Sequence, residues 1–373
     1  MIAMNDFQAQ WAEAGPAALS AVARVGASGR YILGPEVGRF EDELARSWGI
    51  PFAVGVGSGM DAIEIGLRCL GLKPSEKVLT TPLSAFATTL AIVRCGGVPV
   101  FVDTDETGLL DLELARAALA ADRSIRFLVP VHLYGHALDL EALEALRDDF
   151  GLRVVEDCAQ AIGARSAGRV VGSVGQVAAV SFYPTKNLGA YGDGGAILTS
   201  DPGLASAARA LRHYGQTTTY VHDELGLNSR LDELHAAVLA DALLPRLPAF
   251  TARRRELAET YRQRIRQGAV TLPPVPPRSE PVWHLFPVVV REGSREGFRE
   301  FLDRNGVASG VHYPRVIPDQ RALRDHGRFE TRDGLERARR LAAREVSIPI
   351  HPFLSDEDAV RVSDAVSAWS GGC

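Results

Sequence analysis

The chain contains little lysine, little cysteine and no long apolar run. Only three of its 41 basic residues are lysines, and the basic residues form no block or strip, so the electrostatic pattern of a nucleic-acid-binding protein is missing. No apolar stretch reaches the roughly 18 residues of a membrane helix. The N-terminus has an early acid and no apolar core, unlike a signal peptide. We therefore expect neither a nucleic acid nor a membrane as a partner.

Metal and disulfide patterns are also missing. His132 and His136 lie four positions apart, but Gly135 weakens the helix that would place both on one face, so no metal site is expected. No two cysteines have CxxC spacing, which argues against a zinc site and a disulfide framework and favours a reduced, cytoplasmic protein. The four cysteines are Cys69, Cys95, Cys158 and Cys373.

What is present is an ordinary globular composition, with 46% hydrophobic and 23% charged residues and a net charge of −5. A length of 373 residues suits a large α/β domain and a smaller one. The C-terminal third has the pattern of a compact α+β unit, after the Pro-rich segment 271–281. We predict a large domain over residues 1–245 and a small domain over residues 246–373.

Short β-rich apolar runs alternate with helical stretches, such as 60–71 and 140–150, up to about residue 200. Several runs are apolar without alternation, as expected for parallel strands buried on both faces. The pattern predicts an α/β fold with a mostly parallel central sheet, in which ligands bind beyond the carboxyl ends of the strands. The runs are FAVGVGS, KVLTTP, VPVFVD, IRFLVPVHLYG, LRVVEDCAQ, VAAVSFY and GGAILTS.

Further elements are expected in the second half of the chain. Residues 230–266 have the pattern of a long helix that breaks near Pro245 and Pro248. The elements expected after the Pro-rich segment are a strand over 284–290, a helix over 295–306, a strand over 307–314 and a final helix from Asp356.

The first strand end predicts a phosphate site. Ser58, Gly59 and Met60 open a helix, and the free N–H groups of a helix N-terminus suit a phosphate. The alternative is an ordinary N-cap serine. A dinucleotide fingerprint is incomplete, because Gly55 and Gly57 would need a third glycine where Met60 stands. A nicotinamide-dependent oxidoreductase is therefore only the second choice on fold alone.

Later strand ends supply an acid and a lysine. Asp157 ends a buried run, so it needs a partner, which is either a structural arginine or the protonated ring nitrogen of pyridoxal phosphate. Ser181 could reach the phosphate of that cofactor, and Lys186 could bond covalently to its aldehyde. A solvated loop lysine is the alternative. Phe86, which follows another strand, either stacks on the ring or packs in the core.

The chain resembles the DegT/DnrJ/EryC1/StrS sugar aminotransferases, which depend on pyridoxal phosphate and have the type I, aspartate aminotransferase fold. The resemblance covers essentially the whole chain. Its motifs, in order, are GRYILGPEVGRFEDELA, GVGSGMDAI, VVEDCAQAIGA, SFYPTKNLGAYGDGGA, NSRLDELHAA and GVHYP.

The resemblance implies a role for each motif residue. Lys186 would hold the cofactor and shuttle protons, Asp157 would pair with the ring nitrogen, and Gln160 would lie near the phenolic oxygen. Phe86 would stack on the ring. A homodimer with shared active sites would follow, because one phosphate ligand comes from the neighbouring subunit. The phosphate ligands would be Ser58, Gly59, Met60, Ser181 and, from that neighbour, Asn228.

The resemblance also implies the sugar side of the site. Tyr183 would shape the rim, and His312 and Tyr313 would face the sugar. The chain has Val316 and Pro318 where the family often has a proline and a histidine, so the sugar contacts differ from the family pattern. Met60 replaces the commoner threonine, which leaves only its backbone N–H for the phosphate.

The expected reaction moves an amino group from L-glutamate, through pyridoxamine phosphate, to a nucleotide-linked keto-deoxyhexose, and releases 2-oxoglutarate. The segment that ends in NSRLDE is most similar to members that aminate 3-keto sugars, which favours a dTDP-linked 3-keto-6-deoxyhexose. Members that act on 4-keto sugars more often have an aromatic residue in place of Ser229, and this substrate is the alternative. A dehydratase would have histidine in place of Lys186. A non-catalytic regulator would have lost the lysine, the acid or the Ser-Gly turn.

Overall fold

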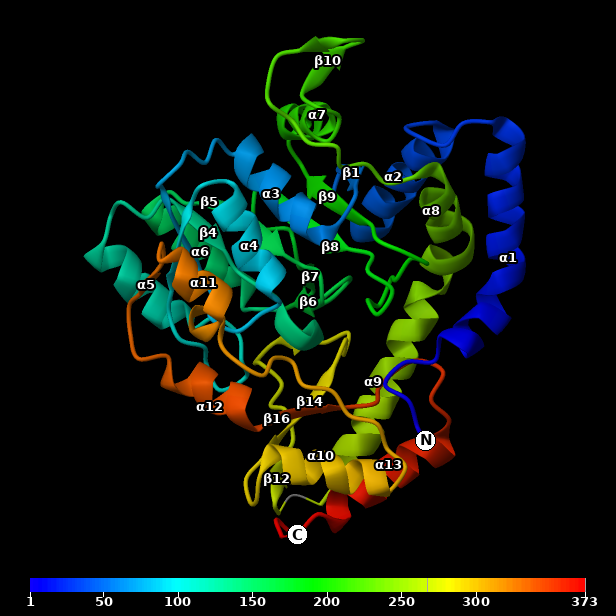
Figure 1. The fold of residues 1–373 in the computed structure, drawn as a ribbon, viewed down its shortest axis with the longest axis vertical. Helices are drawn as coiled ribbons and strands as arrows, with labels where there is room; N and C mark the ends of the chain where they lie inside the picture. Colours follow the sequence, from blue (N-terminus) through cyan, green and yellow to red (C-terminus); the bar gives the residue numbers. More distant parts are fainter. Residues whose placement is uncertain (267, 373) are drawn as a thin grey trace.

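The computed structural model describes residues 1–266 and 268–372, and Cys373 therefore lies outside the described residues. A sheet of eight strands forms the centre of the larger lobe (Figure 1). The predicted α/β fold with a mostly parallel sheet is confirmed, and β9 is antiparallel to both of its neighbours, β1 and β8. The strand order is β1 (Phe52–Val56), β9 (Gly195–Thr199), β8 (Val177–Ser181), β5 (Arg153–Asp157), β4 (Phe127–Val129), β2 (Lys77–Thr80), β3 (Val98–Phe101) and β15 (Glu330–Thr331).

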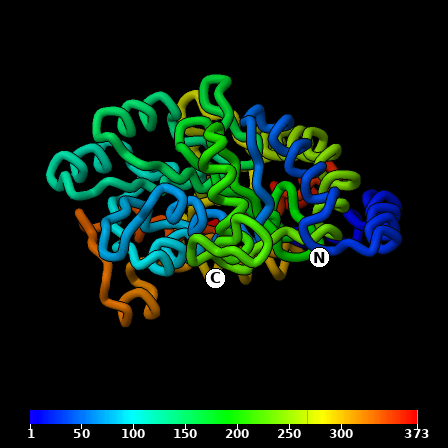
Figure 2. The backbone as a smooth tube through the Cα atoms, turned by 90° about the horizontal axis from the view of Figure 1, so that it is seen from above, coloured from blue at the N-terminus to red at the C-terminus, as the bar shows by residue number. Residues whose placement is uncertain are grey.

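Helices cover both faces of this sheet (Figure 2). In β8, Ala178 and Val180 enter the core that includes residues of α1 and α2, whereas Val177 and Ala179 enter the core that includes α3 and α7. Alternate residues thus pack on opposite sides, which explains the continuous apolar runs. The helices of this lobe are α1 (Phe7–Ser28), α2 (Pro35–Trp48), α3 (Gly59–Cys69), α4 (Phe86–Arg94), α5 (Leu112–Ala121), α6 (Leu140–Phe150), α7 (Pro202–Leu211) and α8 (Glu233–Val238).

A smaller lobe contains a second sheet and its own core. The antiparallel strands β12 (Val270–Thr271), β14 (Phe286–Val290) and β16 (Glu345–Ile348) are covered by helices (Figure 1). The predicted strand over 284–290 and helix over 295–306 are present. The helices of the C-terminal part are α9 (Leu247–Arg264), α10 (Arg295–Arg304), α11 (Arg321–His326), α12 (Glu336–Arg344) and α13 (Asp356–Ala368).

The predicted strand over 307–314 is wrong. Val307 and Gly310 pair there only in isolated bridges, to Ile2 and Ser347, and no strand of the described residues covers this segment. The ladder stops because the N–H of His312 donates to the side chain of Glu345, at 2.6 Å, instead of to a strand carbonyl. The predicted break in the long helix is present, since π and 3-10 turns over Leu239–Arg246 separate α8 from α9.

The boundary at residues 245 and 246 stays a prediction, and several segments make contacts across it. Ile2 packs into the core of the smaller lobe, and β15, from the C-terminal part, extends the large sheet beside β3. Among the described residues, no helix combines the length and hydrophobicity needed to cross a bilayer.

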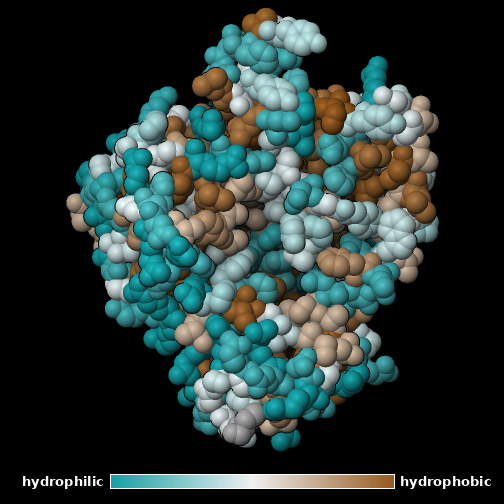
Figure 3. All heavy atoms as spheres, in the orientation of Figure 1, coloured by the Kyte–Doolittle hydropathy of each residue, from teal (hydrophilic) through white to brown (hydrophobic). Residues whose placement is uncertain are grey.

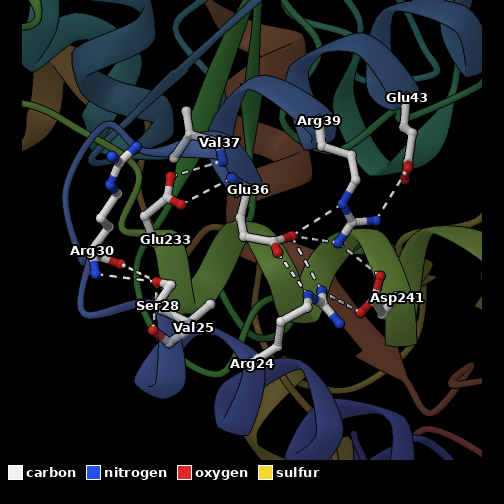
Figure 4. A network of polar contacts seen from close by, with 10 residues as sticks. All are labelled: Arg24, Val25, Ser28, Arg30, Glu36, Val37, Arg39, Glu43, Glu233 and Asp241. Atoms are coloured by element: carbon white, nitrogen blue, oxygen red, sulfur yellow. Dashed lines mark hydrogen bonds and ion pairs between the residues drawn. The ribbon is translucent and has the colours of Figure 1, made fainter.

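The start of α2 is fixed by a residue far along the chain. Its N-cap, Gly34, has no side chain to offer, and buried Glu233 accepts the N–H groups of Gly34, Glu36 and Val37 instead, each at 2.9 Å. Arg24 of α1 also contacts both Glu36 and Asp241 (Figure 4). Glu233 thereby ties the NSRLDE segment to the start of α2.

Candidate active site

A cavity of about 490 Å³ opens between the two lobes at the carboxyl ends of β5 and β8. This is where a wound sheet usually binds its ligand. Most of the predicted site residues meet here, although their sequence positions span more than 250 residues. Those that line the cavity are Ser58, Gly59, Met60, Asp157, Ser181, Tyr183, Lys186, His312 and Tyr313.

Lys186 presents a free amine to the cavity. The N–H of Lys186 donates to the carbonyl of Tyr183 at 2.8 Å, so Pro184 lies within a tight turn. The ammonium group forms no hydrogen bond or ion pair with any described residue. Burial lowers its pKa from 10.5 to about 8, and the charge of Asp157 opposes this shift. The lysine is therefore no solvated loop residue, and a sizeable share of it is neutral near pH 8.

Asp157 is held by hydrogen bonds. Its Oδ2 accepts the hydroxyl of Thr88 at 2.8 Å, and its Oδ1 accepts the N–H of Ala159 at 3.1 Å. Ser84 lies 2.9 Å from the Thr88 hydroxyl and extends the chain. No described arginine or lysine forms an ion pair with Asp157, so the structural-arginine alternative finds no support. Asp157 lines the cavity, so the carboxylate oxygens can accept a further hydrogen bond from a ligand there.

The helix start offers donors for an anion. The hydroxyl of Ser58 accepts the N–H of Asp61 at 3.1 Å as an N-cap, while the N–H groups of Gly59 and Met60 have no partner among the described residues. A Cβ at Gly59 would lie 2.6 Å from the Cβ of Ser181, so only glycine lets the helix start approach the end of β8. These donors and the Ser181 hydroxyl fit a phosphate group.

Three predicted residues lie outside the cavity lining. Gln160 accepts the N–H of Tyr134 at 2.8 Å and donates to the hydroxyl of Tyr313 at 2.9 Å, so it touches the site through that tyrosine. Phe86 begins α4 and packs against a small hydrophobic cluster, and its stacking on a ring stays a prediction. Asn228 is exposed and lines a surface hollow on the outer side of the Ser58 turn.

Several lining residues were not predicted. Met4 and Asn5 come from the N-terminal segment, and His284 and Arg254 come from the smaller lobe. The Arg254 guanidinium donates to backbone carbonyls, among them that of Ile350 at 3.0 Å, and forms no ion pair with a described residue. Burial lowers the Arg254 pKa to about 10. Of these four residues, Arg254 alone carries a charge at neutral pH, and it brings a positive charge to the cavity wall.

Two histidines of the cavity are held neutral. Burial, and then the charge of Lys186, lower the pKa of His284 well below its ordinary value and that of His312 to about 4. Lys186 and both histidines line the same cavity. Near neutral pH both imidazoles are therefore uncharged, whereas Lys186 can gain or lose a proton. This difference suits Lys186 to exchange protons.

A cluster of possible metal ligands contains His132 but not His136. His132, Glu156 and Cys158 place their ligand atoms within 4.8 Å of one another. Both ring nitrogens of His132 are engaged, by Glu156 at 2.9 Å and by the N–H of Leu138 at 3.1 Å. Glu156 also accepts three backbone N–H groups of the 172–175 loop. These contacts indicate a structural cluster that fixes the end of β5 and hence Asp157. The described cysteines are free.

Comparisons with known proteins identify the family. A model of the DegT/DnrJ/EryC1/StrS aminotransferase family matches residues 13–367. The chain is 43% identical over 367 residues to the dTDP-3-amino-3,4,6-trideoxy-alpha-D-glucose transaminase of Streptomyces venezuelae, covering 98% of this chain and 95% of that protein. It is 36% identical to the UDP-N-acetyl-3-dehydro-alpha-D-glucosamine 3-aminotransferase of Acidithiobacillus ferrooxidans, covering 98% and 97%. The solved structure of S. venezuelae DesV in complex with a ketimine intermediate matches with a TM-score of 0.93 and 42% identity, covering 99% of this chain and 98% of that chain.

Proposed function

Because the chain belongs to the DegT/DnrJ/EryC1/StrS aminotransferase family and is a pyridoxal-phosphate-dependent sugar aminotransferase, we propose that it transfers an amino group from L-glutamate to a dTDP-linked 3-keto-6-deoxyhexose. The observation that carries this proposal is the meeting, in one cavity, of an unpaired lysine amine, an acid without a cation and free N–H groups at a helix start. The enzyme would work in the cytoplasm.

The residues divide the work of holding the cofactor. When bound, pyridoxal phosphate supplies an electron sink and carries the amino group between donor and acceptor. Asp157 would keep its ring nitrogen protonated, and Lys186 would hold its aldehyde in the resting enzyme and then move protons. Phe86 would stack on the ring and Gln160 would lie near its phenolic oxygen. The phosphate would be bound by Ser58, Gly59, Met60 and Ser181.

The regiochemistry is supported by the relatives rather than by a contact in the cavity. Both transaminases described above are named for amination at the 3-position, one on a dTDP sugar and one on a UDP sugar. Ser229 does not face the cavity: its hydroxyl accepts the N–H of Gly57 at 2.9 Å and donates to Asp61 at 2.8 Å. Ser229 is buried, so an aromatic side chain would not fit at this position. Through Gly57 and Asp61, Ser229 contacts the helix start that carries the predicted phosphate site. A 4-keto sugar is the alternative substrate.

The test is a substrate panel. Holoenzyme with L-glutamate is incubated with dTDP- and UDP-linked 3-keto and 4-keto deoxyhexoses, and the product mass and the position of the new amine are read by mass spectrometry and NMR. We expect amination of the dTDP-linked 3-keto compound, with kcat/KM at least about tenfold above that of the others, since one differing hydrogen bond has this effect. Amination of 4-keto sugars alone would refute the regiochemistry, and no amination at all would refute the proposed function.

We also propose a homodimer whose active sites are shared. Large apolar side chains are exposed on α1, on the cavity rim and on the hairpin of β10 (Gln216–Thr218) and β11 (Val221–His222), and Figure 3 shows apolar side chains at that hairpin and on the side of the molecule that carries α1. Such a surface suits an isologous contact. Asn228, which lies outside its own cavity, would then reach the phosphate of the other subunit.

Mixed dimers test this arrangement. Asn228→Asp places a negative charge against the phosphate and Lys186→Ala removes the essential amine, so each variant alone should be inactive. After mixing and exchange of subunits, one site in a mixed dimer has both native residues, and about a quarter of wild-type activity is expected. Activity that stays at background, although mass spectrometry detects mixed dimers, would contradict a shared site.

A further inference from the structure

His312 is tied to a buried carboxyl through a serine. Glu345 and Ser347 lie two apart in β16, so their side chains project from the same face of the strand. The Ser347 hydroxyl donates to Oε1 of Glu345 and lies 2.9 Å from Nδ1 of His312. Oε2 of Glu345 accepts the backbone N–H of His312 at 2.6 Å. The bridge between Gly310 and Ser347 fixes this register.

The Nε2 atom of His312 is free for a ligand. His312 lines the cavity, and Nε2 has no hydrogen-bond partner among the described residues. The Tyr134 hydroxyl donates to the carbonyl of His312 at 2.5 Å and, with the Glu345 contact, holds the backbone on both sides. The ring is neutral near pH 7, so Nε2 either donates or accepts a hydrogen bond, according to the tautomer.

Glu345 is a buried carboxyl that no described cation contacts. It is fully buried, and no described residue forms an ion pair with it. Burial raises its pKa from 4.5 to about 7, against the opposing effects of the Ser347 hydroxyl and the His312 N–H. The other charged and titratable groups that act on or near it are Arg295 and Arg299 of α10, Tyr134, Tyr313 and, through His312, Lys186.

The hydrogen-bond chain has two consistent arrangements. When Glu345 is ionised, Ser347 donates to it, Nδ1–H of His312 donates to Ser347, and Nε2 presents a lone pair. When a proton enters at Nε2, the Nδ1 proton passes to the Ser347 oxygen and the Ser347 proton passes to Oε1 of Glu345. Nε2 then carries a proton, and the imidazole has never remained charged. One proton has been taken up, and it resides on Glu345.

We propose that Glu345, Ser347 and His312 form a proton relay in which the protonation of Glu345 decides whether His312 donates or accepts a hydrogen bond at the sugar. Glu345 and Ser347 are positioning residues, and the inference rests on the proposed function. A keto oxygen only accepts hydrogen bonds, whereas an amine can donate. The state with Nε2–H therefore favours the keto sugar, and the state with a free lone pair favours the amino product.

The relay is tested with Glu345→Gln. The glutamine oxygen can accept the backbone N–H of His312, and the glutamine NH2 can donate to the Ser347 oxygen. The Ser347 hydroxyl then donates to Nδ1 of His312, so the ring keeps its proton on Nε2 at every pH. We compare how far kcat/KM of the holoenzyme for the keto sugar falls between pH 6 and 8.5. The fall should be about tenfold larger in the wild type than in Glu345→Gln, because a tenfold change corresponds to about one hydrogen bond. Ser347→Ala cuts the chain and should also remove this pH-dependent step. Glu292→Gln, at an exposed loop position, is the control and should keep the wild-type profile.

Nitrogen NMR of histidine-labelled holoenzyme gives a readout that is independent of turnover. The His312 signal, identified by its loss in His312→Gln, should change tautomer across neutral pH in the wild type and stay Nε2–H in Glu345→Gln. A tautomer that is the same at all pH values in the wild type, or parallel kinetic profiles for wild type and both relay variants, would overturn the relay. Absence of any sugar amination would refute the proposed function instead, and the NMR titration would still decide the relay.

Discussion

Replacing Lys186 by alanine is expected to lower the rate of transamination by about 10⁴-fold or more. In the proposed mechanism the amine would serve both half-reactions, as the covalent holder of the cofactor and as the group that moves protons, and general acid–base catalysis alone contributes about 10²–10⁴-fold. Its pKa of about 8 also predicts the pH dependence. The neutral form of the amine, which would bond to the cofactor aldehyde, becomes more abundant as the pH rises from 7 to 9, so reconstitution of the apoenzyme should accelerate over that range.

The measurements are the rate with glutamate and the keto sugar and the visible absorbance of the lysine-linked cofactor. Lys73→Ala removes an exposed lysine and is the matched control. Because the chain has only three lysines, borohydride reduction of the holoenzyme followed by peptide mapping identifies the one that holds the cofactor. Cofactor trapped on Lys73 or Lys77, or a Lys186→Ala enzyme with wild-type absorbance, would be incompatible with this role.

The predicted site residues meet because of strand topology. Asp157 and Ser181 end the neighbouring parallel strands β5 and β8, and Ser58 follows β1, which runs in the same direction as β8. The carboxyl ends of such strands lie at one edge of the sheet, so residues that are distant in the chain come together. Lys186 joins them five residues after Ser181. Local pattern and topology were sufficient for this part of the site.

The residues that were missed depend on packing between lobes. Arg254 stands among three consecutive arginines in α9, and no sequence pattern distinguishes the buried one from its neighbours. Asn5 reaches the cavity because Ile2 pairs with Val307 in the smaller lobe, a contact between opposite ends of the chain. Nothing in the sequence distinguishes Thr88 from an ordinary helix residue. Its hydrogen bond to Asp157 forms because α4 approaches β5.

The wrong strand over 307–314 has the same kind of cause. Its residues have a β-rich pattern, but the side chain of Glu345 replaces the strand partner that His312 would need. Propensity is overridden here by a single buried carboxyl, a tertiary effect that the local sequence does not contain. The place where local pattern fails is also where the proposed relay lies, which agrees with the tendency of functional sites to violate local rules.

Replacing Asp157 by asparagine is expected to lower kcat by about 10³-fold with little loss of stability. The amide keeps the shape of the side chain but has no negative charge to stabilise a proton on the ring nitrogen, so the electron sink weakens. The asparagine oxygen can accept the N–H of Ala159 while its NH2 donates to the Thr88 hydroxyl, so both sides of the amide keep a partner. We therefore expect the melting temperature to change by only a few degrees, of the order that about 1 kcal/mol produces.

The matched control is Thr88→Val, which removes one hydrogen bond to Asp157 but leaves its charge. It should lower kcat by about tenfold, because the carboxylate is less firmly held but still ionised. Single-turnover rates with glutamate measure both variants before the sugar enters. If Asp157→Asn and Thr88→Val lost the same amount of activity, the carboxylate would act through its position alone, and the pairing of its charge with the ring nitrogen would be excluded.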